Sequence, residues 1–435
     1  MSTTISPVRL RLWTAVSLVI GCVIGSGVFV KPGKVLAAAG SSNGALLAWV
    51  FGGVMSLAGG LTAAEIAFRI PKTGGVYVYL EELYGKAVGF VCGWVQVLIY
   101  GPGLMAALSL YFGSLFAQFF GLPATQQKPI ALITLYLLAL LNARSARASG
   151  ALSDATTALK LLPILAIGVG GLVMGNATIF NQELPHPEKA AGLGAAVLAC
   201  LWAYDGWMQV TNIAGEIDNP ARNLPRAIVV GLATVMTAYL LVNLSLFHVL
   251  LPTELASLNE KAASVAATKL FGSVGGKLLS LGILISIFGC LNGNILTLTR
   301  VLYAIASRGT FPMRERFANL HPIYQTPIGS IVAKVTIATV MILLLDPDRI
   351  TDLAMFSMYL FYSLVFIGIF RVRSRHGVPA AGEYRVPLYP IVPLIAFGGC
   401  LFIISGMLRQ APKDAAITVT CDGPRTRIYC LYDDD

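Results

Sequence analysis

The chain has 435 residues, of which 56% are hydrophobic and only 12% are charged, whereas a soluble domain carries about 25% charged residues. This composition excludes a soluble globular protein and a disordered chain, and long apolar blocks without period-two alternation exclude an outer-membrane barrel. The net charge of +10 is spread between the apolar blocks rather than clustered, so we expect no nucleic-acid partner. The sequence therefore predicts an all-α membrane protein with many spans.

The spans are predicted from stretches without Asp, Glu, Lys or Arg, because a bilayer core about 30 Å thick needs about 20 helical residues. Eight such stretches are long enough: 12–30, 35–64, 87–127, 161–182, 227–253, 278–299, 353–370 and 386–408. Three more, at 129–143, 190–215 and 317–345, are short or interrupted by a charge. The predicted total is eleven spans.

The loop charges predict the orientation of the chain. When the loops are assigned alternately to the two sides, 17 Lys and Arg residues lie on the side of the N-terminus and 8 lie on the other side, up to the eleventh span. Cytoplasmic loops are the ones enriched in Lys and Arg. We therefore expect a cytoplasmic N-terminus, and the positive charge acts mainly as an orientation signal.

Two of the predicted spans are interrupted at membrane depth. Gly25 and Gly27 interrupt the first span, and Asp205 interrupts the sixth. Glycine alone also suits tight helix packing, but a carboxylate in the membrane is a functional candidate. Residues 12–175 and 190–372 are of similar length and each begins with an interrupted span, which is the pattern of an inverted-repeat transporter with its site where the breaks meet.

The two breaks have complementary chemistry. An unwound backbone at Gly25-Ser26-Gly27 would present free N–H groups at the N-terminus of a half-helix, which favours a carboxylate. Free carbonyls at Trp202 to Asp205, at the end of another half-helix, would accept hydrogen bonds from an ammonium group. An α-amino acid carries both groups.

Five segments resemble one known family: VIGCVIGSGVFVKPGKVL, AEIAFRIPKTGGVYVYLEELYG, LWAYDGW, GEIDNPARNLPRAI and IFGCLNGN. The chain is similar, over about residues 10–408, to the L-type amino acid transporter family of the amino acid-polyamine-organocation superfamily, and within it to bacterial serine/threonine and alanine-serine-cysteine exchangers. The resemblance implies a LeuT-type fold of two inverted five-helix repeats with broken helices 1 and 6. It also implies sodium-independent exchange of small neutral L-amino acids, such as serine, threonine and alanine, across a bacterial cell membrane.

The resemblance also implies roles for particular residues. The N–H groups near Ser26 and Gly27 would bind the substrate carboxylate, and the carbonyls of Val23, Trp202 and Asp205 would bind its amino group. Gly25 and Ala203 complete the implied substrate site, and Trp202 is also the expected extracellular gate. The Asp205 side chain departs from the glycine that is common in animal members, and it could bias the preference for substrate size or charge.

Lys160 is expected near the start of the fifth span, where the family resemblance implies that an ammonium group replaces a sodium ion. A lysine that extends its amino group to the membrane surface remains the alternative. Lys334 is expected to reach the membrane surface in this way, and Glu65 is expected to form a local ion pair with Arg69 or Lys72.

No cofactor, metal site or enzymatic centre is predicted, because the four histidines are scattered and no C-x-x-C motif occurs. We also expect no obligatory heavy-chain partner, since the predicted loop at 121–129 has no cysteine. Two other functions stay open: a proton-coupled amino acid symporter, and an amino acid sensor that does not transport.

Residues 409–435 are polar and cannot supply the twelfth helix that the family normally has. A truncated or frame-altered end and a functional ending both fit this tail. Taken literally, eleven spans would put the C-terminus outside the cell.

Overall fold

The computed structural model describes residues 11–410, except for 71, 73, 259–260, 310–313 and 381–382. The predicted polar tail therefore lies almost entirely outside the described residues. Within them the regular secondary structure is helical, apart from one isolated bridge between Ser41 and Glu183. The all-helical prediction is confirmed.

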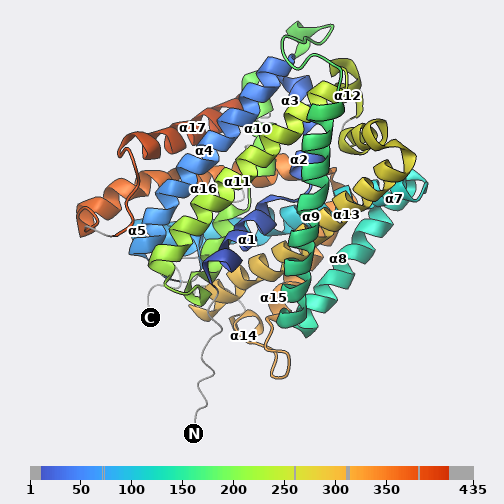
Figure 1. Ribbon diagram of the computed structural model, residues 1–435. Helices are drawn as coiled ribbons and strands as arrows, with labels where there is room; N and C mark the ends of the chain where they lie inside the picture. Colours follow the sequence, from blue (N-terminus) through green and yellow to red (C-terminus); the bar gives the residue numbers. More distant parts are fainter. Residues whose placement is uncertain are drawn as a thin grey trace.

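Within the described residues, eight helical segments are long and apolar enough to cross a membrane, so the chain is a multi-pass membrane protein. They are Leu12–Val30 (α1 and α2), α4 (Ser42–Arg69), Lys86–Phe119 (α6, η1 and α7), Ala124–Arg144 (η2 and α8), α9 (Ala146–Met174), the part of α11 (Pro220–Val249) from Arg222, α13 (Ala262–Ser307) and α16 (Pro347–His376). Two shorter apolar helices, α15 (Ile328–Leu344) and α17 (Ile391–Gln410), accompany them. Helix α11 packs between α4 and α9 (Figure 1).

Short helices connect the long ones. They are α3 (Pro32–Ala39), α5 (Val76–Tyr84), η3 (Pro187–Lys189), α12 (Pro252–Leu258) and α14 (Arg314–Phe317). Helices α3 and α12 lie at the top of the bundle in Figure 1, and α14 lies at the bottom.

Helix α9 begins much earlier than the predicted fifth span and also ends earlier. It begins after Ser145, whose side chain accepts a hydrogen bond from the Ala148 N–H and so caps the helix. The prediction began at residue 161 because it excluded charged residues, but α9 contains both Lys160, which is buried, and Asp154, which lies exposed on one face. As a result Lys160 lies in the middle of a long helix rather than near its start.

Two helices are interrupted as the sequence predicts. Helix α1 (Leu12–Val23) ends before α2 (Gly27–Val30), and residues 24–26 between them are not helical. Helix α10 (Leu193–Tyr204) ends at Asp205, and the 3-10 helix η4 (Trp207–Glu216) follows. Gly206 joins them with φ +106°, a conformation that favours glycine.

A π-helix, η1 (Gln96–Tyr100), lies between α6 (Lys86–Val95) and α7 (Gly101–Phe119). Pro102 has no N–H, so the ordinary α-helical bond to the Leu98 carbonyl cannot form there. The Gly101 N–H instead bonds to the Gln96 carbonyl, five residues back. This widened turn carries Tyr100 into the interior, where its side chain is buried.

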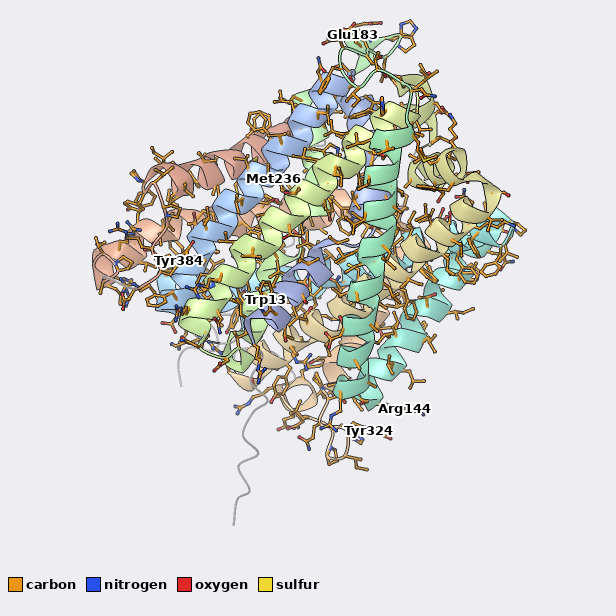
Figure 2. All side chains as sticks on the ribbon, viewed as in Figure 1. Trp13, Arg144, Glu183, Met236, Tyr324 and Tyr384 are labelled. Carbon is orange, nitrogen blue, oxygen red and sulfur yellow. The ribbon has the colours of Figure 1, made fainter. Side chains whose placement is uncertain are left out.

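The outer surface of the bundle carries many apolar side chains. On α9, Leu162, Val169 and Val173 are more than half exposed. Figure 2 places Arg144 and Tyr324 together at one end of the molecule and Glu183 at the opposite end. An apolar belt on a bundle of spanning helices is the surface that faces lipid.

Candidate functional site

The two interrupted helices touch each other at the centre of the bundle. A Cβ atom added to Gly27 would lie 2.4 Å from the Ala203 Cα, and one added to Gly206 would lie 2.8 Å from the Cys22 carbonyl oxygen. Only glycine allows backbones to approach this closely. The breaks of α1 and α10 therefore form one site.

A small cavity of about 20 Å³ lies at this meeting point. It is lined by Cys22, Val23, Gly25, Ser26, Gly27, Leu104, Leu108, Trp202, Asp205 and Gly206. The predicted substrate residues are thus brought together, except that Ala203 packs against Gly27 rather than lining the cavity. The volume suits about one water molecule, so binding of an amino acid requires the site to expand.

The carbonyls of the first break are satisfied by the protein. The five consecutive carbonyls of residues 21–25 accept hydrogen bonds from side chains of α9, α11 and α13. The donors are Lys160 to Gly21 (2.5 Å) and Ile24 (2.8 Å), Cys290 to Cys22 (3.5 Å), Tyr239 to Val23 (3.1 Å) and Ser286 to Gly25 (3.2 Å). The unwound segment is therefore held from three sides.

The donors of the same break have no such partners. Within the described part of the chain, the N–H groups of Gly25, Ser26 and Gly27 donate to no other backbone group. The Ser26 hydroxyl is buried and also lacks a hydrogen-bond partner. Buried donors without acceptors are rare and invite an explanation. This part of the cavity suits an anionic oxygen ligand.

Asp205 supplies the opposite charge. Its side chain is only 6% exposed, and it accepts hydrogen bonds from the hydroxyls of Tyr100 (2.5 Å) and Tyr362 (3.4 Å). None of the described cationic side chains pairs with it. A buried carboxylate that has hydrogen-bond donors around it but no cationic partner among the described residues is suited to a cationic ligand. The cavity thus offers donors on one wall and a carboxylate on the other.

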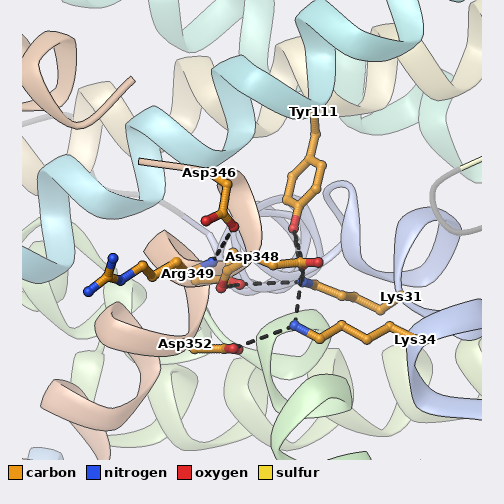
Figure 3. Close-up of polar contacts among 8 residues, drawn as sticks. Lys31, Lys34, Tyr111, Asp346, Asp348, Arg349 and Asp352 are labelled. Atoms are coloured by element: carbon orange, nitrogen blue, oxygen red, sulfur yellow. Dashed lines mark hydrogen bonds and ion pairs between the residues drawn. The ribbon is translucent and has the colours of Figure 1, made fainter. Parts of the chain in front are cut away.

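A cluster of charges lies beyond the first break, at the end of α2 (Figure 3). Lys31 is 2% exposed, and its Nζ lies 2.6 Å from Asp348 Oδ1 on α16 and 2.9 Å from the Tyr111 hydroxyl. Lys34 adds longer ion pairs to Asp348 (3.4 Å) and Asp352 (3.5 Å). These contacts tie the segment after the break to the start of α16.

Trp202 lies next to this cluster. The centres of its ring and the Tyr111 ring are 6.4 Å apart. The predicted gate residue thus lines the cavity and lies near Tyr111, a member of the Lys31 cluster. Sequence reasoning treated Lys31 only as a loop charge, because its acidic partner lies more than 300 positions away.

Sequence reasoning missed Tyr239, although it expected the span around Tyr100 to flank the site. The Tyr239 hydroxyl donates to the Val23 carbonyl (3.1 Å) and lies 2.8 Å from the Ala203 carbonyl, so it bridges both broken helices. Tyr100 bonds to Asp205. Their place in apolar spans was the available signal, since a buried tyrosine usually needs a partner for its hydroxyl.

Two expectations about charged residues are wrong. Glu65 is fully buried and makes a bidentate pair with Arg373 on α16, with both distances 2.7 Å, whereas Arg69 lies 3.8 Å from Glu383. Lys334 does not reach the surface either: its side chain is 0% exposed. Both cases arise because helices far apart in sequence pack together.

The described residues contain no group of three or more His, Cys, Asp or Glu side chains placed to hold a metal ion. The site instead combines spanning helices, two touching helix breaks and a buried polar cavity. This is the architecture of a membrane transporter.

The comparisons with known proteins agree with this class. The amino acid permease family model matches residues 10–418. The serine/threonine exchanger SteT of Bacillus subtilis is 46% identical over 403 residues, which cover 92% of this chain and 91% of that protein. The large neutral amino acids transporter small subunit 2 of Rattus norvegicus is 31% identical over 414 residues, covering 91% and 76%. The b(0,+)-type amino acid transporter 1 of Mus musculus is 28% identical over 421 residues, covering 95% and 85%.

The chain therefore belongs to the amino acid permease family, and it is an amino acid transporter rather than an enzyme. A second family model, the Cap8 HORMA domain, matches residues 403–435. Residues 419–435 lie beyond the amino acid permease match. The two matches overlap at residues 403–418, and only the Cap8 HORMA domain model extends over residues 419–435.

Proposed function

We propose that the chain exchanges small neutral L-amino acids, such as serine, threonine and alanine, across a bacterial cell membrane by alternating access. One observation carries the proposal: unpaired N–H groups and a carboxylate face the same cavity where two broken helices meet. The 46% identity to a protein named a serine/threonine exchanger supports the substrate class and the exchange mode.

In this proposal the substrate spans the cavity. Its carboxylate accepts hydrogen bonds from the N–H groups of residues 25–27 and from the Ser26 hydroxyl, which has no protein partner. Its ammonium group lies between the Asp205 carboxylate and the Trp202 carbonyl. Because Val23 already accepts a bond from Tyr239, its carbonyl is a weaker candidate than the sequence suggested. Leu104 and Leu108 line the same cavity, and in this proposal they contact the substrate side chain.

The proposed fold is a LeuT-type arrangement of two inverted repeats, 12–175 and 190–372, followed by an eleventh span. The two interrupted helices, α1 with α2 and α10 with η4, stand at the start of the two halves and support this division. With the N-terminus in the cytoplasm, the Lys31 cluster lies on the extracellular side. Opening toward that side then requires both the cluster and Trp202 to move.

Lys160 supports transport without sodium. Its Nζ is buried and donates to the carbonyls of Gly21 and Ile24 at the break of α1. A tethered ammonium group in this place does the electrostatic work of a bound monovalent cation. We therefore propose that the driving force comes from the exchanged amino acid and not from a sodium gradient.

The test is counterflow in proteoliposomes made with the purified chain alone, which also tests whether a heavy-chain partner is needed. Labelled serine outside should enter vesicles loaded with unlabelled serine, threonine or alanine, and it should enter equally in sodium and in choline buffer. Empty vesicles should take up little label. Uptake into empty vesicles driven by an imposed pH gradient would instead identify a proton symporter, and substrate-dependent thermal stabilisation without any flux would identify a sensor.

A further inference from the structure

Another buried lysine, besides Lys31 and Lys160, contacts the surroundings of the substrate site but does not line its cavity. Lys334 is on α15, and its Nζ donates to the carbonyls of Leu298 on α13 (2.6 Å) and Gln96 on η1 (3.3 Å). The side chain is 0% exposed. A buried ammonium group is costly unless it makes good hydrogen bonds, so this position has a structural or functional reason.

The reason is visible in the backbone that Lys334 contacts. Gln96 begins the π-helix η1, in which the hydrogen bonds run five residues back rather than the four of an α-helix. Gly101 follows directly, and a Cβ atom there would lie 2.7 Å from the Lys334 Nζ. The absence of a side chain at Gly101 thus makes room for the ammonium group beside the π-helix.

The other end of this π-helix bears on the substrate site. Its last residue, Tyr100, donates its hydroxyl to Asp205 Oδ2 at 2.5 Å. In a helix each residue turns the side chain by about 100°, so a loosened turn moves the hydroxyl of Tyr100 away from the carboxylate. Lys334 therefore fixes one end of a short segment, and the other end orients Asp205.

We propose that Lys334 is a positioning residue for substrate binding, which holds the π-helix so that Tyr100 orients the Asp205 carboxylate toward the amino group of the substrate. This inference rests on the proposed function. It assigns to Lys334 a role parallel to that of Lys160: each ammonium group binds two backbone carbonyls, and at least one of them belongs to an irregular part of a helix near the cavity.

The test is a double-variant cycle of Lys334→Met and Tyr100→Phe in counterflow. The methionine keeps the apolar part of the lysine side chain. Both carbonyls that lose the ammonium group stay within helices, since Leu298 lies in α13 and Gln96 still accepts the Gly101 N–H. The fold should therefore persist. Each single variant should raise the half-saturating serine concentration about tenfold, as expected for one hydrogen bond to a charged group, with little change in the maximal rate. The double variant should match Tyr100→Phe alone.

Thr336→Ala is the matched control, because Thr336 lies exposed on the same helix and bonds only to the Val332 carbonyl. It should leave the half-saturating concentration unchanged. If Lys334 were merely structural, Lys334→Met would lower the maximal rate or the unfolding temperature and leave the half-saturating serine concentration unchanged. That result overturns the role of Lys334. A double variant whose half-saturating concentration rises by the product of the two single effects overturns it as well. If the wild-type vesicles show no counterflow, the proposed function itself has failed.

Discussion

Replacing Lys160 by methionine removes the ammonium group that holds the first helix break. The Nζ donates to two carbonyls at 2.5 and 2.8 Å, and both belong to the non-helical turn or the residues just before it. A hydrogen bond to a charged group contributes about 1.5–3 kcal/mol, so the two together contribute about 3–6 kcal/mol. If only about 1.4 kcal/mol of this acts on the substrate site, serine binding weakens about tenfold.

The assay is binding of labelled serine to the purified variant, together with counterflow in sodium and in choline buffer. Leu159→Ala is the control, because its side chain is exposed on the neighbouring position of the same helix. We expect at least a tenfold loss of affinity for Lys160→Met, estimated as above from its hydrogen bonds, and no loss for the control. If Lys160→Met binds and exchanges serine as wild type does, the break is held by other contacts and the reasoning is refuted.

Three further predictions concern the surroundings of the cavity. Gly27→Val should abolish serine binding and lower the stability of the fold by about 3 kcal/mol, because the added Cβ would overlap the backbone of Ala203. Serine binding and thermal unfolding measure the two effects, and normal binding would contradict the close approach of Gly27 to Ala203. Lys31→Met removes the ion pair with Asp348, so an impermeant thiol reagent added outside should label Cys22 in the cavity faster. An unchanged labelling rate would argue against an outer gate at this ion pair. Glu65→Gln removes the buried carboxylate that pairs with Arg373 and should cost about 3 kcal/mol of stability with serine affinity retained. A lower affinity at normal stability would place Glu65 in binding instead.

The sequence was sufficient for features that depend on local composition. The apolar blocks predicted the spanning helices. The first interruption was marked by Gly25 and Gly27, and the second by Asp205. These signals work because a bilayer demands long apolar helices, and because a glycine pair or a buried carboxylate is informative there. Excluding charged residues, however, shortened the predicted spans, as the early start of α9 shows.

Contacts between distant helices were beyond the same reasoning. Glu65 was expected to pair with nearby Arg69 or Lys72, but it pairs with Arg373, because the packing of α4 against α16 decides which charge is near. Lys334 was expected at the surface for a similar reason: its two carbonyl partners belong to other helices. A single sequence contains no direct record of such neighbours.

The unequal satisfaction of donors and acceptors at the first break has a kinetic consequence. Without substrate, the N–H groups of residues 25–27 have no backbone acceptor among the described residues, which costs about 1–3 kcal/mol for each buried donor. The 20 Å³ cavity has room for about one water. The carboxylate of a bound amino acid supplies acceptors for these N–H groups. We infer that the loaded carrier crosses between its two open states over a lower barrier than the empty carrier. A carrier that returns quickly only when loaded exchanges one amino acid for another, and it does so without any ion to enforce the coupling.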